Sequence, residues 1–187
     1  MINKKAVSPV VAEILLVMLT IAAVALVATF LVNFIGPTLN RSTECTPYKD
    51  YFKFKEEFDV NGVIYRYNCQ QDNLFGASIQ AASGLKKVEN LSGFKLVFVE
   101  ESGSTMVVTV NDTITGSAEV GKIKMFGATG TLKVPFGGNS YTYVYNATGG
   151  KQFKTIEVYP ILTNGRVCEV SDSIEITGCT KVNLAAT

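Results

Sequence analysis

Few residues of this sequence have the types and spacing that catalysis or metal binding requires. The chain has no histidine, which excludes histidine-dependent triads, histidine-ligated metals and an imidazole pH switch. Two acidic pairs, Glu56-Glu57 and Glu100-Glu101, lie in β-prone segments, where adjacent side chains point to opposite faces and form no carboxylate dyad. Phosphate-binding glycine loops, G-x-S-x-G and acidic metal clusters are missing too. We expect no enzyme activity, no cofactor and no metal site.

The cysteines are the second candidate group, and they indicate an exported domain. Cys45, Cys69, Cys168 and Cys179 contain no C-x-x-C pair, so the spacing does not favour a zinc or redox motif. All four follow a long apolar segment, in the part that would be exported, where disulfides persist. Three connectivities are possible. We expect Cys45–Cys69 and Cys168–Cys179, because each bond would join nearby segments; four free buried thiols are the alternative.

Asparagines in N-x-Ser/Thr sequences offer a third kind of chemistry, N-glycosylation. They follow the apolar segment and stand at Asn40, Asn90, Asn111 and Asn146. Surface glycosylation is therefore a hypothesis for these four sites.

The apolar segment near the N-terminus separates two parts of different character. The chain has 17 Lys+Arg against 16 Asp+Glu, and a net charge of +1 argues against non-specific nucleic-acid binding. Before Arg41 the only charges are Lys4, Lys5 and Glu13, and residues 14–35 are apolar on every side of a helix. That run meets the ~20 residues needed to cross a bilayer. Pro9 suits the first helical position, and Gly36 with Pro37 predicts the end of the helix.

Three interpretations of this helix compete. A cleaved secretory signal has a shorter apolar core of about 7–15 residues followed by a small-residue site, which residues 30–33 do not offer. A signal anchor fits well, because Lys4 and Lys5 would stay cytoplasmic while the C-terminal part is exported. The third interpretation comes from the residues at the front of the helix.

Residues 4–16, Lys-Lys-Ala-Val-Ser-Pro-Val-Val-Ala-Glu-Ile-Leu-Leu, resemble the N-terminus of archaeal type IV pilins. In that family a prepilin peptidase removes a short basic leader on the cytoplasmic side, and the apolar helix survives processing. The resemblance covers about the first 36 residues and implies cleavage between Ala6 and Val7. It also implies a membrane-inserted precursor, with its N-terminus inside, that the pilus assembly machinery builds into a filament.

Glu13 departs from the better-known bacterial pattern, in which the glutamate is the fifth mature residue; here it would be the seventh. An unpaired carboxylate in a bilayer or a dry helical bundle is costly. Either Glu13 reaches the headgroup region, or it pairs during assembly with the new amine at Val7 of a neighbouring subunit. Over one and a half helical turns separate it from its own Val7, which argues against pairing within one chain.

The rest of the chain predicts a β domain. Asn61-Gly62 between two β-prone runs is a hairpin signal. Further β-prone runs, separated by glycine-rich turns, indicate a sandwich: 94–99, 105–110, 122–126, 131–134, 141–145, 153–159 and 166–170. Residues 74–88 could form a short helix or an irregular loop. Tyr141, Tyr143 and Tyr145 share one strand face, where cross-strand packing is favoured over a binding surface.

These observations predict an α+β chain in which a long hydrophobic helix precedes an all-β, immunoglobulin-like sandwich. The expected parts are a leader (1–6), an assembly or transmembrane helix (7–37, including Pro9 and Glu13) and an extracellular β domain (38–187). The resemblance implies a homopolymeric extracellular archaeal pilus with a core of helices and a sheath of β domains, serving surface adhesion. The alternatives are a membrane-anchored β-domain binding protein that does not polymerise, and an archaellin or minor pilin.

Overall fold

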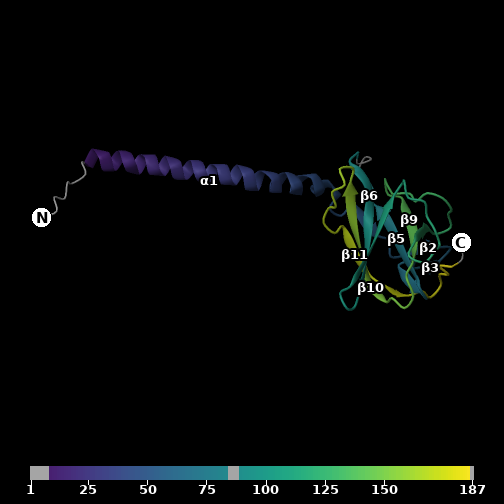
Figure 1. Cartoon of the computed structure of the whole chain (residues 1–187). Helices are drawn as coiled ribbons and strands as arrows, with labels where there is room; N and C mark the ends of the chain where they lie inside the picture. The colour runs from purple at the N-terminus through teal and green to yellow at the C-terminus, as the bar shows by residue number, and fades with distance from the viewer. Residues whose placement is uncertain (1–8, 84–88, 186–187) are drawn as a thin grey trace. The chain divides into compact units, whose positions relative to one another are not determined.

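The computed structural model describes residues 9–83 and 89–185, and of residues 32–42 the backbone alone. The chain divides into two compact units, residues 1–46 and residues 47–187. The first contains a single described helix, α1 (Pro9–Cys45), and the second contains the strands (Figure 1). The predicted order of a long apolar helix followed by a β sandwich is confirmed.

Helix α1 begins at Pro9 and continues through Gly36 and Pro37 to Cys45, so the predicted end at residue 37 is wrong. Pro37 lacks the N–H that would bond to the carbonyl of Asn33, and a proline inside a helix costs about 3 kcal/mol. That cost is local: the turns on both sides keep their own hydrogen bonds, and the residues after Pro37 remain helical. A short 3₁₀ helix, η1 (Thr46–Tyr48), follows.

One sheet of the β unit has six strands in the order β12-β4-β5-β9-β8, with β1 also paired to β5. Its strands are β1 (Phe52–Phe54), β4 (Cys69–Gln71), β5 (Leu74–Ala81), β8 (Ile123–Met125), β9 (Ser140–Asn146) and β12 (Thr177–Gly178). Strands β1 and β4 share one edge of β5, each pairing with one half of it, while β9 pairs along the other edge. Among the described strands of this sheet, β12 and β4 alone pair in parallel.

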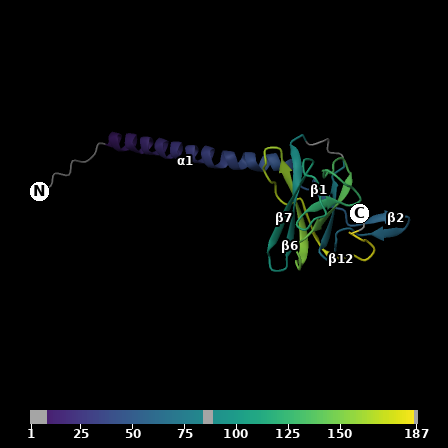
Figure 2. The same cartoon turned by 45° about the vertical axis from the view of Figure 1, so that its right-hand side comes forward.

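The second sheet has four antiparallel strands in the order β11-β10-β6-β7. They are β6 (Leu91–Glu100), β7 (Thr105–Asn111), β10 (Phe153–Leu162) and β11 (Asp172–Glu175). A separate hairpin of β2 (Phe58–Val60) and β3 (Val63–Tyr65) projects from the unit in Figure 2. Its turn residues Asn61 and Gly62 have φ of 55° and 79°, which confirms the predicted hairpin.

Aromatic rings from the two sheets meet in the core between them. Phe94 of β6 contacts Phe52 at 4.8 Å and Tyr143 at 5.4 Å between ring centroids. Phe98 contacts Tyr145 at 5.0 Å. All five side chains are buried. These rings therefore stabilise the packing of the two sheets through the apolar area they bury and through edge-to-face and stacked ring contacts.

Three segments differ from the predicted strands. Residues 74–81 form β5, a central strand, rather than a helix or loop. Residues 131–134 and 166–170 are not strands; each contributes one isolated bridge, at Thr131 and Val167. The second segment instead turns back onto the end of β10, where the N–H of Cys168 bonds to the Pro160 carbonyl at 2.9 Å.

Candidate functional site

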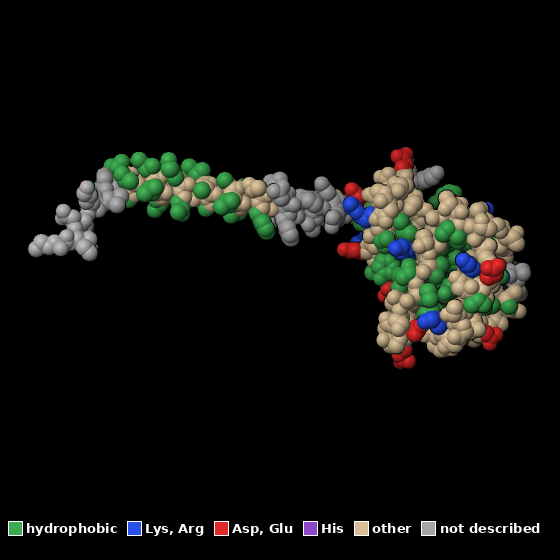
Figure 3. All heavy atoms as spheres, in the orientation of Figure 1, with side chains coloured by type: hydrophobic (Ala, Val, Ile, Leu, Met, Phe, Trp, Pro, Cys, Tyr) green, Lys and Arg blue, Asp and Glu red, His purple; other side chains and the backbone are tan. Residues whose placement is uncertain are grey.

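The candidate assembly surface is the apolar part of α1, Pro9–Leu31, a span of 23 residues that is long and apolar enough to cross a membrane. At ~1.5 Å per residue it is roughly 34 Å long, against a hydrocarbon thickness of ~30 Å. Its large apolar side chains are all exposed, from 44% at Leu31 to 74% at Leu26. On the face shown in Figure 3, hydrophobic side chains cover this part of the helix. Such a surface needs lipid or protein around it.

The two threonines within residues 14–31 do not interrupt this surface. The hydroxyl of Thr20 donates to the Val17 carbonyl, and that of Thr29 donates to the Ala25 carbonyl, both at 2.8 Å. Because each hydroxyl is satisfied by its own helix, it needs no water and no partner from outside. The helix can therefore move from lipid into a protein environment without leaving a polar group unpaired at these positions.

One side of α1 carries a shallow apolar groove, lined by Ala23, Val24, Val27, Ala28 and Leu31. The spacing of three, four and eight residues places these side chains on adjacent rows of the helix surface. Ala23 and Ala28 lower the floor of the groove, which allows the backbone of another helix to approach closely. The groove suits a ridge of side chains from a second helix.

The residues expected to be cleaved, Ala6 and Val7, lie outside the described residues, as do Lys4, Lys5 and Ser8. Pro9 stands at the start of α1, and Glu13 lies one turn further along with its side chain exposed. The position of Glu13 near the start of the helix is compatible with both roles considered for it.

The four cysteines are all disulfide-bonded, and none is free. The predicted pairing is wrong, because Cys69 bonds to Cys179 across 110 residues of sequence. The prediction assumed that cysteines close in sequence pair with each other. Instead β12 lies parallel to β4, with Thr177 opposite Cys69, so segments distant in sequence meet at one sheet edge. Neither Cys45–Cys69 nor Cys168–Cys179 can therefore form.

The C-terminal segment after β12 covers part of the six-stranded sheet. Leu184 is fully buried against Cys69 and Val144, and its N–H donates to Oε1 of Gln71 at 2.7 Å. The N–H of Cys179 bonds to the Gln70 carbonyl at 3.0 Å. We call this segment, residues 179–185, the C-terminal strap. The sequence contains no signal for it, because a two-residue parallel pairing leaves no periodic pattern.

The predicted glycosylation sites differ in their surroundings. Asn90 is exposed in the turn before β6. Asn111 accepts hydrogen bonds through Oδ1 from the N–H and the hydroxyl of Thr113, the third residue of its own sequence motif. The side-chain amide of Asn146 donates to the Ala118 carbonyl at 2.9 Å, and the side chain of Asn40 lies outside the described residues. Of the described three, Asn90 is exposed, and Asn146 differs from Asn111 in that its side-chain nitrogen donates a hydrogen bond to the protein.

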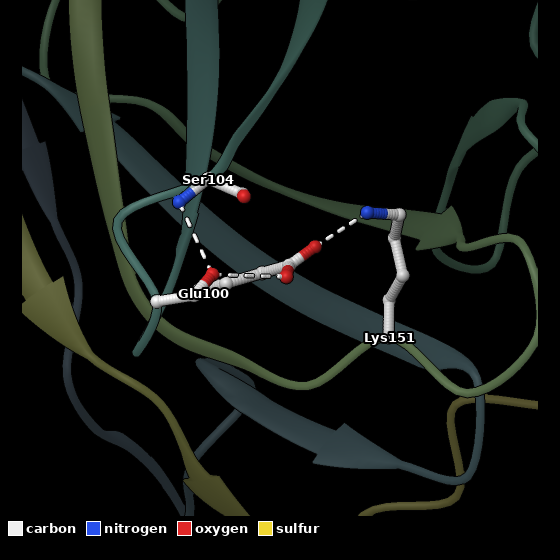
Figure 4. A network of polar contacts seen from close by, with 4 residues as sticks. Glu100, Ser104 and Lys151 are labelled. Atoms are coloured by element: carbon white, nitrogen blue, oxygen red, sulfur yellow. Dashed lines mark hydrogen bonds and ion pairs between the residues drawn. The ribbon is translucent and has the colours of Figure 1, made fainter.

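The acidic pairs are not dyads: one glutamate of each, Glu57 and Glu100, forms an ion pair with a basic residue. Figure 4 shows the ammonium group of Lys151 donating to Oε1 of Glu100. The hydroxyl of Ser102 donates to Oε2 of the same carboxylate. The hydrogen bond from Lys151 lowers the pKa of the Glu100 carboxyl, and the Ser102 hydroxyl adds to this effect. Glu57 pairs with Arg66 at the surface. These ion pairs stabilise turns and strand ends.

The tyrosine row of β9 is part of the core. Tyr143 and Tyr145 are buried against Phe94 and Phe98 of the opposite sheet, so these two residues pack between the sheets rather than across neighbouring strands, and Tyr141 is half-buried. The Tyr143 hydroxyl donates to the carbonyl of Lys133, and burial raises its pKa. Among the residues that the structure describes, no three His, Cys, Asp or Glu side chains are grouped to hold a metal ion.

Comparison with known proteins identifies the N-terminal segment. Residues 5–44 match the family model of the archaeal type IV pilin N-terminal region. No curated protein matches the chain. Among solved structures, similarity is found to the archaellum periplasmic stator protein complex FlaF and FlaG from Sulfolobus acidocaldarius, with 8% identity, a TM-score of 0.35 and coverage of 67% of this chain and 88% of that one. A Northeast Structural Genomics Consortium target, SoR45, shows 11% identity, a TM-score of 0.25 and coverage of 71% and 86%.

Proposed function

We propose that this chain, which carries an archaeal type IV pilin N-terminal segment joined to a β sandwich, is a structural subunit of an extracellular archaeal type IV pilus. The pilin segment supports a surface-filament subunit of the pilin or archaellum type. The observation that carries the proposal is the exposed apolar surface of α1 over Pro9–Leu31. Before assembly lipid surrounds this surface, and in the filament the helices of other copies surround it.

Processing and assembly follow from the same segment. Prepilin peptidase cuts between Ala6 and Val7 while the N-terminus faces the cytoplasm, and the assembly machinery then withdraws the helix from the membrane. The helices form the filament core, and the β domains form the outer sheath. Adhesion to surfaces is the role we assign to that sheath, with glycans at sites such as Asn90 and Asn111. We assign no catalytic role, no cofactor and no nucleic-acid partner.

Assembly requires that Glu13 leave the headgroup region. We assign Glu13 to the positive amine created at Val7 of a neighbouring subunit, since an unpaired carboxylate inside a helical core is costly. The alternative, a membrane-anchored β domain that does not polymerise, makes no use of such a pair. The two functions therefore differ in what a neutral residue at position 13 does.

The test compares filament formation by the native chain, by a deletion of residues 7–36 and by Glu13→Gln. The deletion should yield a soluble β domain without filaments, and Glu13→Gln should slow or abolish assembly while leader removal and membrane insertion continue. Glu101→Gln, which removes an exposed charge from the β unit, is the matched control and should assemble normally. Normal filaments from the deleted chain would overturn the helix-core proposal, and normal assembly of Glu13→Gln would overturn the pairing alone.

A further inference from the structure

The two sheets differ in how their edges are protected. The β11 edge of the four-stranded sheet is tied to β1, because the Phe52 N–H donates to the Ser171 hydroxyl at 3.0 Å and the Phe54 N–H donates to Asp172 at 2.8 Å. In the six-stranded sheet, β12 has only two residues, and the disulfide at Cys179 follows it. The β8 edge is covered by a backbone hydrogen bond from Ser117 to Ile123.

The β7 edge is left unpaired by residues 9–83 and 89–185. In the described part of the chain, the backbone of residues 105–110 forms hydrogen bonds to β6 alone, so every second N–H and C=O points away from the sheet. Figure 2 shows β7 beside β6. Proteins usually protect such an edge with lysine, proline, a bulge or a short strand. The strand Thr-Met-Val-Val-Thr-Val-Asn has none of these, and Val107 is 50% exposed.

We propose that β7 pairs antiparallel with β7 of a second copy of this chain in a neighbouring filament, so that the pili associate side by side; this rests on the proposed filament function. The sequence of β7 is suited to antiparallel pairing with a second copy of β7. A two-fold axis at Val107 places Thr105 opposite Thr109 and Met106 opposite Val108, so that threonine faces threonine and an apolar residue faces an apolar residue. Residues 105–111 carry no charge, and two copies therefore meet without repulsion inside the pair.

The symmetry decides that the pair joins two filaments. Neighbours within one helical filament are related by a rotation and a translation, which makes their contacts heterologous, whereas β7 against β7 is isologous. One short strand pair also buries less than the roughly 1,000 Å² that a stable interface between two isolated subunits needs. Repeated along two filaments, weak contacts add through avidity. Detergent-solubilised subunits should accordingly remain monomeric.

The test measures side-by-side association of purified filaments by electron microscopy and low-speed sedimentation. Val107→Lys places like charges opposite each other and should reduce the associated fraction about fivefold or more. The control is Val120→Lys, which changes the same residue type at an exposed turn, 62% exposed, and should associate like the native filament. Equal association of the Val107→Lys and native filaments would overturn the proposal, as would native filaments that stay single. Absence of filaments from the native chain would instead overturn the proposed function.

Cysteine cross-linking tests the occupant and the symmetry. Filaments of Val107→Cys made with and without ¹⁵N should give subunit dimers on mixing and oxidation, and these should include dimers of one heavy and one light chain. Val120→Cys filaments should give none. Dimers within each isotope only would place the contact inside one filament, and a cross-link to a different protein would give the edge another occupant; either result overturns the proposal.

Discussion

Removing the Cys69–Cys179 disulfide should destabilise the β unit more than any single surface change. The bond closes a loop with a sequence separation of 110. In the chain-entropy model a lone loop of that length is worth about 4.8 kcal/mol at 25 °C, which is an upper bound here because the other two cysteines are also bonded; measured values range from about 2 to 5 kcal/mol. The perturbation is the double variant Cys69→Ala/Cys179→Ala, which leaves no unpaired thiol at these positions.

The corresponding shift in melting temperature follows from the size of the unit. Residues 47–187 comprise about 140 residues, for which the entropy of unfolding is about 300 cal/mol/K at ~2.1 cal/mol/K per residue. A loss of about 2 to 4.8 kcal/mol therefore lowers the melting temperature by roughly 7 to 16 °C. Circular dichroism of the full chain in detergent, followed through the β signal, measures it.

Hydrogen exchange separates the bond from the packing around it. In the native chain the backbone N–H of Cys179 bonds to the Gln70 carbonyl. In the double variant the backbone N–H at this position should lose its protection from hydrogen exchange. In Leu184→Ala the covalent bond remains, and this amide should stay protected although a buried side chain has been truncated. A decrease in melting temperature of less than about 3 °C, or unchanged hydrogen exchange in the double variant, would show that the disulfide does not hold the segment after β12 against the sheet.

Two further changes test described contacts, and a third tests the leader. Gly76→Ala should cost about 3 kcal/mol in a denaturant titration, because a Cβ there would lie 2.0 Å from the Tyr67 carbonyl oxygen, whereas Gly149→Ala meets no atom within 4 Å and should be near neutral; equal effects would contradict the close approach. Glu100→Gln should lower stability at pH 7, and its difference from the native chain should shrink as the pH falls from the unfolded pKa of about 4.3 through the lower folded pKa of Glu100, while Glu101→Gln should leave stability unchanged over the same range. Changing Lys5 to Glu and Ala6 to Phe should block leader removal in a membrane processing assay, and normal processing of this variant would exclude the proposed cleavage site.

Where local chemistry decided the structure, the sequence predicted it. Asn61 and Gly62 tolerate positive φ, so the β2–β3 hairpin could be placed before any contact was known. The apolar run of α1 and the inward-facing Tyr143 and Tyr145 were equally visible, because the first reflects composition and the second a period of two.

Where contacts distant in sequence decided it, prediction failed. Strand β5 contains Gly76, Ala77 and Ser78, residues of low strand propensity, and it is a strand because β1, β4 and β9 pair with it and Tyr67 approaches its glycine. The disulfide connectivity depends in the same way on the parallel contact between β4 and β12. The helix end was missed because a proline marks a probable boundary only, and a helix can continue past it.

The candidate assembly site was predictable in outline. The resemblance at residues 4–16 located the pilin segment that the family comparison then identified over residues 5–44. The groove lined by Ala23 and Ala28 required the helix surface, and the open edge of β7 required the sheet order. Neither is visible in the sequence, because each depends on which faces and edges the rest of the chain leaves uncovered.

The N-terminal mass of the subunit isolated from filaments shows which form of the chain assembles. We expect filaments built from chains that begin at Val7 and retain the whole apolar span of α1. Filaments built from chains that still begin at Met1, or from chains cut after the apolar span, would contradict it, since in either case the processed helix could not be the element that assembles.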